Sequence, residues 1–400
     1  MQEYWVWLQL ALGVGNRKTD AVLQTYDDPW EFYGDVKAGH RILQCFNNEE
    51  VARLKACPLE KALEVLNKCR ESGITVLTPS DPGFPSRLIN IYETPCALYI
   101  KGDLGKIDDE PAVAVVGTRD MTEYGAQAAF KISRDLAAAH VTVVSGMAAG
   151  IDACAHKGAL ASGGRTVAVL GCGVDVVYPS GNRNLYEAIS KMGVLLSEYP
   201  PGTKPIGHHF PWRNRIIAAL SLGLLVVEAP EKSGALISAS YALEQGKDVF
   251  AVPGSIFHPN AKGTFQLLKD GASPVSCAED ILEVYEDTFP DKIEKNRSKK
   301  SRLLASTNVK NSKTEKKTEE SPVEEALPKQ SSVHTADAQE KLREMGEGYL
   351  KIYMALSGEP RSLDTLAEEL SMPVHLLASV LTELEILGYA ASHPGKRYSL

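Results

Sequence analysis

The stretch Ala112-Val113-Ala114-Val115-Val116-Gly117-Thr118-Arg119 decides the predicted fold of this 400-residue chain. Its first five residues form an unbroken apolar run of strand length, which predicts a strand buried on both faces. Five further apolar runs follow at helix-length intervals, at 141–145, 166–170, 194–197, 224–227 and 249–252. Strands that alternate with helices predict a doubly wound, mostly parallel α/β sheet over about 111–286.

The patterns on either side of this region predict further domains. Residues 1–75 alternate short amphipathic helical patterns with turns, which predicts a small helical domain of the SAM or helix-hairpin-helix type. Residues 76–288 form the predicted core, with a lead-in segment over 76–110. Residues 289–340 are rich in Lys, Glu, Ser and Thr and nearly free of aromatic residues, which predicts a flexible linker. Three helical patterns and a hairpin over 341–400 predict a winged helix.

The composition excludes several classes of protein. Apolar residues make up 44% and charged residues 24% of the chain, which is typical of folded soluble domains. The net charge of −8 argues against a surface that is basic throughout, but it allows a local basic groove. No apolar run reaches the roughly 18 residues that a membrane span needs, and residues 1–14 lack the features of a secretory signal. We therefore expect a cytoplasmic protein that has no membrane partner.

The seven cysteines are scattered, with no spacing typical of a metal site. We expect them to be reduced and mostly buried, and we expect neither a metal nor a cofactor. A dinucleotide site is disfavoured because the second core strand does not end in an acid. A nucleotide-binding P-loop is disfavoured because no Gly-Lys pair is followed by Ser or Thr.

Short turns rich in small residues follow nearly every predicted strand, among them Gly117-Thr118-Arg119, residues 145–150 and Ser233-Gly234. In a parallel sheet these turns lie along one edge, where ligands bind and where helix N-termini attract anions. The turns therefore predict a phosphate-binding edge, although short loops between strands and helices also need glycine. A similar turn at residues 13–15 suits either a phosphate or two packed helices.

The interval between Glu198 and Glu228 contains no acidic residue. It carries these basic and aromatic side chains: Lys204, His208, His209, Phe210, Trp212, Arg213 and Arg215. Cations bind phosphates and rings stack on exposed bases, at about 1–3 kcal/mol per base, so this interval predicts binding of single-stranded DNA. The alternative is that the rings cap the sheet edge while Arg213 and Arg215 pair with carboxylates. On the first interpretation, both arginines can be changed to Glu with little loss of stability.

Motifs across residues 80–285 resemble the DNA-processing protein A family, DprA/Smf. They are, in chain order, Phe84-Pro85, residues 97–102, 116–119 and 145–152, Tyr178-Pro179, and residues 197–200, 210–217, 233–236 and 252–254. The resemblance implies a Rossmann-like core and a homodimer that binds single-stranded DNA without sequence preference. It also implies that the protein protects incoming DNA and loads a RecA-type recombinase during natural transformation, without catalysis.

The DNA-binding groove is expected to combine the residues of the turns and of the acid-free interval. We expect it to contain Gly117, Arg119, Ser145, Gly146, Gly150, Lys204, Phe210, Trp212, Arg213, Asn214, Arg215, Lys232, Ser233 and Gly234. Arg119 is expected to clamp phosphate, and the alternative is an ion pair with Asp120, Asp152 or Glu228.

Two other functions compete with this interpretation. The core also resembles the lysine-decarboxylase-like phosphoribohydrolases, which act on nucleoside monophosphates through a glutamate. Ser238 stands where that glutamate would fall, so the enzyme is disfavoured. A sequence-specific repressor is disfavoured because the third winged-helix helix has no Lys or Arg. That helix carries His375, Ser379, Thr382, Glu383 and Glu385, which favours protein contact or packing over duplex binding through Lys396 and Arg397.

Overall fold

The computed structural model forms two compact units, residues 1–310 and 311–400, which are described separately. It describes residues 1–293 except 27, 41–43 and 90, and residues 347–399 except 357–359, 371, 373, 375–376, 378–379, 382–383, 385–388 and 394–396. Most of the predicted linker at 289–340 lies outside these residues, and the predicted domain boundaries stay predictions.

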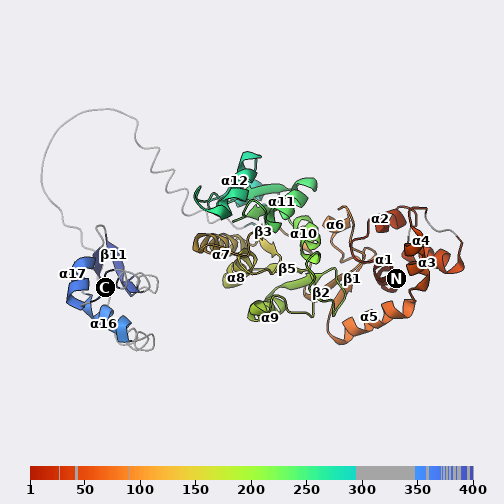
Figure 1. Ribbon diagram of the computed structural model, residues 1–400, viewed down its shortest axis with the longest axis horizontal. Coiled ribbons are helices and arrows are strands. Elements are labelled where there is room, and N and C mark those ends of the chain that lie inside the picture. Colours follow the sequence, from red (N-terminus) through yellow and green to blue (C-terminus); the bar gives the residue numbers. More distant parts are fainter. Residues whose placement is uncertain are drawn as a thin grey trace. The chain divides into compact units, whose positions relative to one another are not determined.

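Helices open the chain and share one apolar core (Figure 1). They are α1 (Gln2–Leu12), α2 (Lys18–Leu23), α3 (Pro29–Ala38), α4 (Asn48–Ala56) and α5 (Leu59–Glu71). Trp7, Phe32 and Leu54 are fully buried in this core, which also takes in Tyr99 from the sheet. Helix α4 begins with a capping box, in which Asn47 and Glu50 satisfy each other's backbone N–H groups. The predicted helical region is therefore present and packs directly on the edge of the sheet.

A nine-stranded sheet forms the centre of this unit, in the order β1-β2-β6-β5-β4-β3-β7-β8-β9. Strands β3 to β9 pair in parallel, and β1 and β2 add an antiparallel edge. The strands are β1 (Thr75–Leu77), β2 (Leu98–Gly102), β3 (Ala112–Val116), β4 (Thr142–Ser145), β5 (Thr166–Leu170), β6 (Val194–Ser197), β7 (Gly223–Val226), β8 (Asp248–Ala251) and β9 (Ser273–Pro274). The six predicted core strands are confirmed, with ends that differ by one residue at most.

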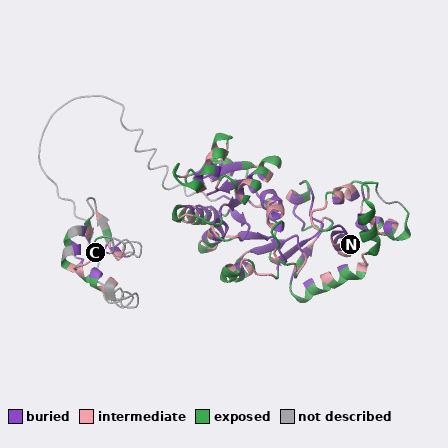
Figure 2. Cartoon of the chain, in the orientation of Figure 1, coloured by how far each residue is buried: buried purple, intermediate pink, exposed green. Residues whose placement is uncertain are grey.

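Helices cover both faces of the sheet, and Figure 2 shows the buried strands between them. They are α6 (Ser86–Ile89), α7 (Glu123–Ala138), α8 (Ile151–Ala161), α9 (Arg183–Met192), α10 (His209–Leu220), α11 (Gly234–Glu244), α12 (Lys262–Lys269) and α13 (Glu279–Tyr285). Side chains of β3 alternate between the faces, because Ala114 packs with α10 and α11 while Val113 and Val115 pack with α7 and α8. Burial on both faces explains the unbroken apolar run that predicted this strand.

Strand β3 lies at the point where the chain reverses its direction of winding. From β3 the chain winds outward through β4, β5 and β6, and it then returns to place β7 on the other side of β3. In open α/β sheets, ligands bind outside the carboxyl ends of the strands at such a switch point. The loops that follow β3 and β7 are therefore the first place to look for a site.

The second unit contains α16 (Glu347–Ala355), β10 (Arg361–Ser362), α17 (Leu363–Leu370), β11 (Ala391–His393) and β12 (Arg397–Ser399). The strands form an antiparallel sheet in the order β10-β12-β11, and Leu366, Leu377 and Leu381 are buried beside it. The residues expected to decide its partner, His375, Ser379, Thr382, Glu383, Glu385 and Lys396, lie outside the described residues, while Arg397 is exposed. Within the described residues no helix combines the length and apolar character needed to cross a membrane.

Candidate nucleic-acid interface

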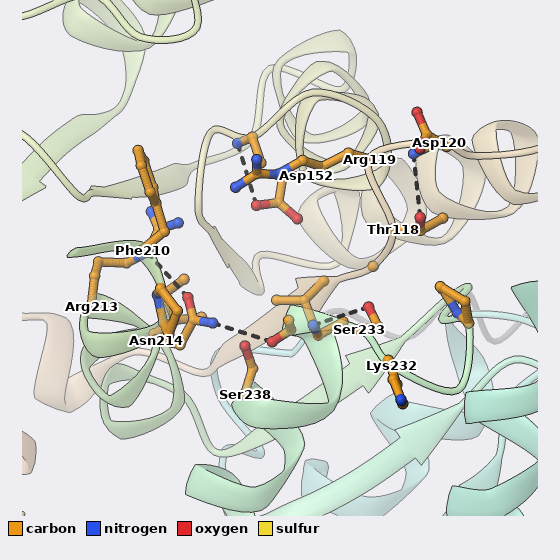
Figure 3. Close-up of a pocket in the computed structure, with 18 of the residues that line it drawn as sticks. Thr118, Arg119, Asp120, Asp152, Phe210, Arg213, Asn214, Lys232, Ser233 and Ser238 are labelled. Atoms are coloured by element: carbon orange, nitrogen blue, oxygen red, sulfur yellow. Dashed lines mark hydrogen bonds between the residues drawn. The ribbon is translucent and has the colours of Figure 1, made fainter. Parts of the chain in front are cut away.

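A cavity of about 380 Å³ opens at the switch point, between the loop after β3 and the loop after β7 (Figure 3). Eight of the fourteen predicted groove residues line it: Gly117, Arg119, Phe210, Arg213, Asn214, Lys232, Ser233 and Gly234. Thr118, Asp120, Asp152 and Ser238 complete its polar lining. The cavity thus joins residues that are more than one hundred positions apart in the sequence.

Arg119 and Phe210 form the mouth of the cavity. The Arg119 guanidinium is exposed and lies 5.6 Å from the centre of the Phe210 ring, within the range of a cation–π contact. Among the described residues, none forms a hydrogen bond or an ion pair with this guanidinium. The carboxylate of Glu228, one of its possible partners, instead accepts a hydrogen bond from the Thr122 N–H at 2.9 Å at the start of α7. Arg119 therefore keeps its hydrogen-bonding capacity for a ligand.

Tyr178 extends this aromatic surface, and the sequence analysis did not include it among the groove residues. Its ring lies 5.2 Å from that of Phe210 and is tilted by 32°, and its side chain is 38% exposed. The residue belongs to a quoted motif, but no neighbouring basic residue marked it as part of a binding surface. The two rings and the Arg119 guanidinium form a continuous platform.

Arg213 braces the cavity from inside. It is 4% exposed, and its Nη1 donates hydrogen bonds to the carbonyl oxygens of Gly146, at 2.7 Å, and Val169. Burial lowers the pKa of Arg213 to about 10, so the guanidinium is still charged at neutral pH. A Cβ atom on Gly146 would lie 2.6 Å from this guanidinium, which explains the need for glycine there. Arg213 therefore holds the turn after β4 in place and supplies positive charge.

Asp152 is the buried one of two acidic residues in the lining, and the other, Asp120, is exposed. Asp152 lies in the first turn of α8, is 6% exposed, and its Oδ2 accepts a hydrogen bond from the Ala148 N–H at 3.4 Å. Burial raises the pKa of this carboxyl, and the charge of Arg213 opposes that shift. From the sequence, Asp152 was expected as part of the motif at residues 145–152 and as a possible partner of Arg119. The ionised carboxylate repels a phosphate bound in the cavity.

The start of α11 forms the opposite wall. Ser233 caps this helix, because its Oγ accepts a hydrogen bond from the Ala235 N–H at 3.2 Å. The Asn214 side chain donates to the Gly234 carbonyl oxygen at 3.3 Å and so ties α10 to α11. Lys232 and Gly234 are exposed just before and at the helix start. A helix N-terminus and a lysine therefore lie across the cavity from Arg119.

Two of the predicted groove residues are placed differently from the expectation. Trp212 and Arg215 do not line this cavity but line a second one. Arg215 is 1% exposed, and its Nη2 donates to the Glu198 carboxylate at 2.8 Å and to the Glu93 carbonyl oxygen at 2.9 Å. This is the carboxylate pairing that the sequence left open. The expectation that Arg213 and Arg215 can be changed to Glu without loss of stability is wrong, because both are buried.

The remaining predicted residues lie outside the cavity lining. Lys204 is exposed on the loop before α10. Ser145 is buried, and its hydroxyl donates to the Val115 carbonyl oxygen at 2.6 Å. Gly150 adopts a φ of +82°, and a Cβ there would lie 2.4 Å from the Thr118 carbonyl oxygen. Ser145 and Gly150 thus shape the edge of the sheet behind the lining.

Comparison with models of known families assigns the chain to one family. The model of a family described as DNA recombination-mediator protein A matches residues 75–286, and that of the DprA winged helix domain matches residues 336–396. The chain belongs to the DNA recombination-mediator protein A family. Both family matches agree with the resemblance noted in the sequence, and they place the chain among the DprA/Smf recombination mediators.

Individual DprA and Smf proteins show the same relationship. The chain is 35% identical to Protein Smf of Synechocystis over 99% of this chain and 98% of that protein. It is 40% identical to DNA processing protein DprA of Bacillus subtilis over 64% of this chain and 87% of that protein. The X-ray structure of DprA from Streptococcus pneumoniae matches with a TM-score of 0.61 and 34% identity, covering 71% of this chain and 97% of that one. The match to Protein Smf extends over nearly the whole chain.

Proposed function

We propose that this recombination mediator binds single-stranded DNA, without sequence preference, across the cavity at the switch point. The observation that supports the proposal best is Arg119, whose exposed guanidinium stacks on Phe210 at the mouth of the cavity and has no polar partner in the described part of the chain. Lys232 and the N-terminus of α11 provide further groups for phosphate on the opposite wall. Phosphate contacts carry no sequence information, so binding through them is independent of base sequence.

The rings of Phe210 and Tyr178 favour a single strand over a duplex. Bases of a duplex are stacked on each other, so their faces are closed to the aromatic platform, whereas an unpaired base can stack on it. We propose direct contacts with DNA for Arg119, Phe210, Asn214, Lys232, Ser233 and Gly234. Gly117, Ser145, Gly146, Gly150 and Arg213 would shape the groove, and Lys204 would meet the strand outside the cavity.

The proposed role extends to the partners that the family resemblance implies. The chain would act as a homodimer that protects incoming DNA and loads a RecA-type recombinase during natural transformation. A cytoplasmic location agrees with the seven cysteines, all of which are free thiols. Adding the chain to single strands covered with single-strand-binding protein should speed recombinase filament formation, and an unchanged rate would contradict the loading role.

A phosphoribohydrolase is the competing function, and the lining gives it little support. Ser238 is 1% exposed and offers a hydroxyl where those enzymes have a glutamate. A hydroxyl is a much weaker acid or base than a carboxylate near neutral pH, so it cannot replace the glutamate in general acid–base catalysis. Incubation with AMP should therefore release no ribose 5-phosphate, and release at enzymatic rates would overturn the non-enzymatic proposal.

The binding proposal is tested by fluorescence anisotropy with labelled oligonucleotides of one length. Strands of thymine, of adenine and of mixed sequence should bind with similar affinity, and the matching duplex should bind more weakly. A strong preference for one sequence, or tighter binding of the duplex, would contradict the proposed mode.

A further inference from the structure

A second cavity, of about 550 Å³, lies where three distant parts of the chain meet. The turn before α2 contributes Arg17, and the lead-in segment contributes residues such as Tyr92 and Glu93. Helix α10 contributes Trp212 and Arg215, and the end of α11 and the residues after it contribute Tyr241, Glu244, Gln245 and Lys247. Its volume falls in the range of small-molecule sites.

The glycine turn at residues 13–15 holds the wall of this cavity in place. Gly15 adopts a φ of +73°, and a Cβ atom there would lie 2.0 Å from Nε1 of Trp212. The sequence left open whether this turn binds a phosphate or packs against helices. Its contact with α10 is a packing contact. The indole is clamped between this turn and the Arg215 guanidinium, which lies 5.3 Å from its ring centre. The indole therefore forms an aromatic wall of the cavity.

Buried polar atoms around this cavity lack hydrogen-bond partners among the described residues. They are three donors, Nε and Nη1 of Arg215 and Nε1 of Trp212, and one acceptor, Oε1 of Gln245. Unsatisfied buried groups are rare in folded proteins and call for a partner. These atoms are buried, and the Gly15 backbone lies against Nε1 of Trp212, so contact with a ligand requires a local shift of the groups that cover them. A ligand that satisfies these atoms offers several hydrogen-bond acceptors and one hydrogen-bond donor.

Lys247 adds a second, independent indication. Its side chain is half-buried, and burial together with the charge of Arg87 lowers its pKa. No carboxylate or carbonyl oxygen of the described residues binds its ammonium group. The two acidic residues of the cavity do not occupy Lys247. Glu93 is paired with Arg17 at 2.9 Å, and Glu244 is exposed. An anionic group on the ligand would therefore find an unpaired cation.

We propose that this second cavity binds a nucleotide. A base such as thymine offers two carbonyl acceptors and one N–H donor for the unsatisfied atoms of Arg215, Trp212 and Gln245, and its ring can contact the aromatic wall. The phosphate meets Lys247. The nucleotide is either a free mononucleotide or one nucleotide of a DNA strand. Phe210 and Trp212 lie on different sides of α10, so a strand bound at the first cavity reaches the second only by passing around this helix.

Calorimetric titration of the full chain with dTMP tests the proposal, with inorganic phosphate as the comparison ligand. Lys247→Gln should weaken dTMP binding at least tenfold, Lys247→Arg should retain most of it, and Lys191→Gln on the exposed face of α9 should leave it unchanged. Equal dTMP affinity of the parent and Lys247→Gln, or phosphate binding as tight as dTMP binding, overturns the proposal.

A second titration distinguishes the two sources of the nucleotide. If the DNA strand supplies it, saturating the chain with oligo-dT should abolish the part of dTMP binding that depends on Lys247. If the ligand is a free mononucleotide, that part persists. The first titration contains no DNA strand, so its result does not depend on whether the proposed single-strand function is correct.

Discussion

Replacing Arg119 by Ala removes an exposed guanidinium at the mouth of the first cavity that has no hydrogen-bond or ion-pair partner among the described residues. A hydrogen bond to a charged group contributes about 1.5–3 kcal/mol, so Arg119→Ala should weaken single-strand binding by about 10- to 150-fold. The loss should be the same for strands of different base composition, because the contact is with phosphate. The plot of log affinity against log salt should also flatten by about 0.7, the expected slope for one phosphate contact with a single strand.

Anisotropy titrations at several salt concentrations measure both effects. Arg119→Lys should recover part of the affinity, since an ammonium group keeps the charge but not the planar fork that stacks on Phe210. Arg53→Ala, an exposed arginine on α4, is the matched control and should bind like the parent. All variants should melt at the parent's temperature. Parent-like affinity of Arg119→Ala, or a loss explained by unfolding, would refute the reasoning.

Three further changes test the surroundings of the two cavities. Asp152→Asn should tighten single-strand binding by removing a buried negative charge from the lining. Because burial raises the Asp152 pKa, parent affinity should rise as pH falls through that raised pKa, and the Asn variant should lack this rise in anisotropy titrations. Arg215→Ala should lower the free energy of unfolding by about 3–5 kcal/mol in denaturant titrations, because it leaves the Glu198 carboxylate buried and unpaired; a loss below about 1 kcal/mol would contradict this. Gly15→Ala should lower the melting temperature more than Gly13→Ala. Both glycines have positive φ, but only a Cβ atom at position 15 would strike the tryptophan indole of α10. Equal melting temperatures of the two variants would contradict this.

The sheet could be predicted from the sequence because burial on both faces leaves an unmistakable pattern. Strands such as β3 and β5 contain no polar side chain that faces solvent, so their ends were visible to within one residue. The parallel topology then determined that the turns at Gly117 and Ser233 meet at one edge. The helical patterns and the hairpin over 341–400 predicted the winged helix, and the family resemblance agreed with that prediction.

The division of α10 between two cavities could not be predicted from a count of charges and rings along the chain. Phe210 and Arg213 are three residues apart and share one side of the helix, whereas Trp212 and Arg215 share another. The helical period separates the two pairs, but the linear interval treated all four residues as one surface. The Arg215 partner Glu198 lies at the end of β6, a contact that depends on the tertiary fold.

The most direct test of the central claim is photo-cross-linking of the full chain to a single strand that carries 5-iodouracil. Peptide mapping should find the adducts on Phe210 or Tyr178, and Arg119→Ala should reduce their yield in proportion to its loss of affinity. Adducts confined to residues 347–399, or a yield that is independent of Arg119, would contradict the placement of the strand at the switch-point cavity.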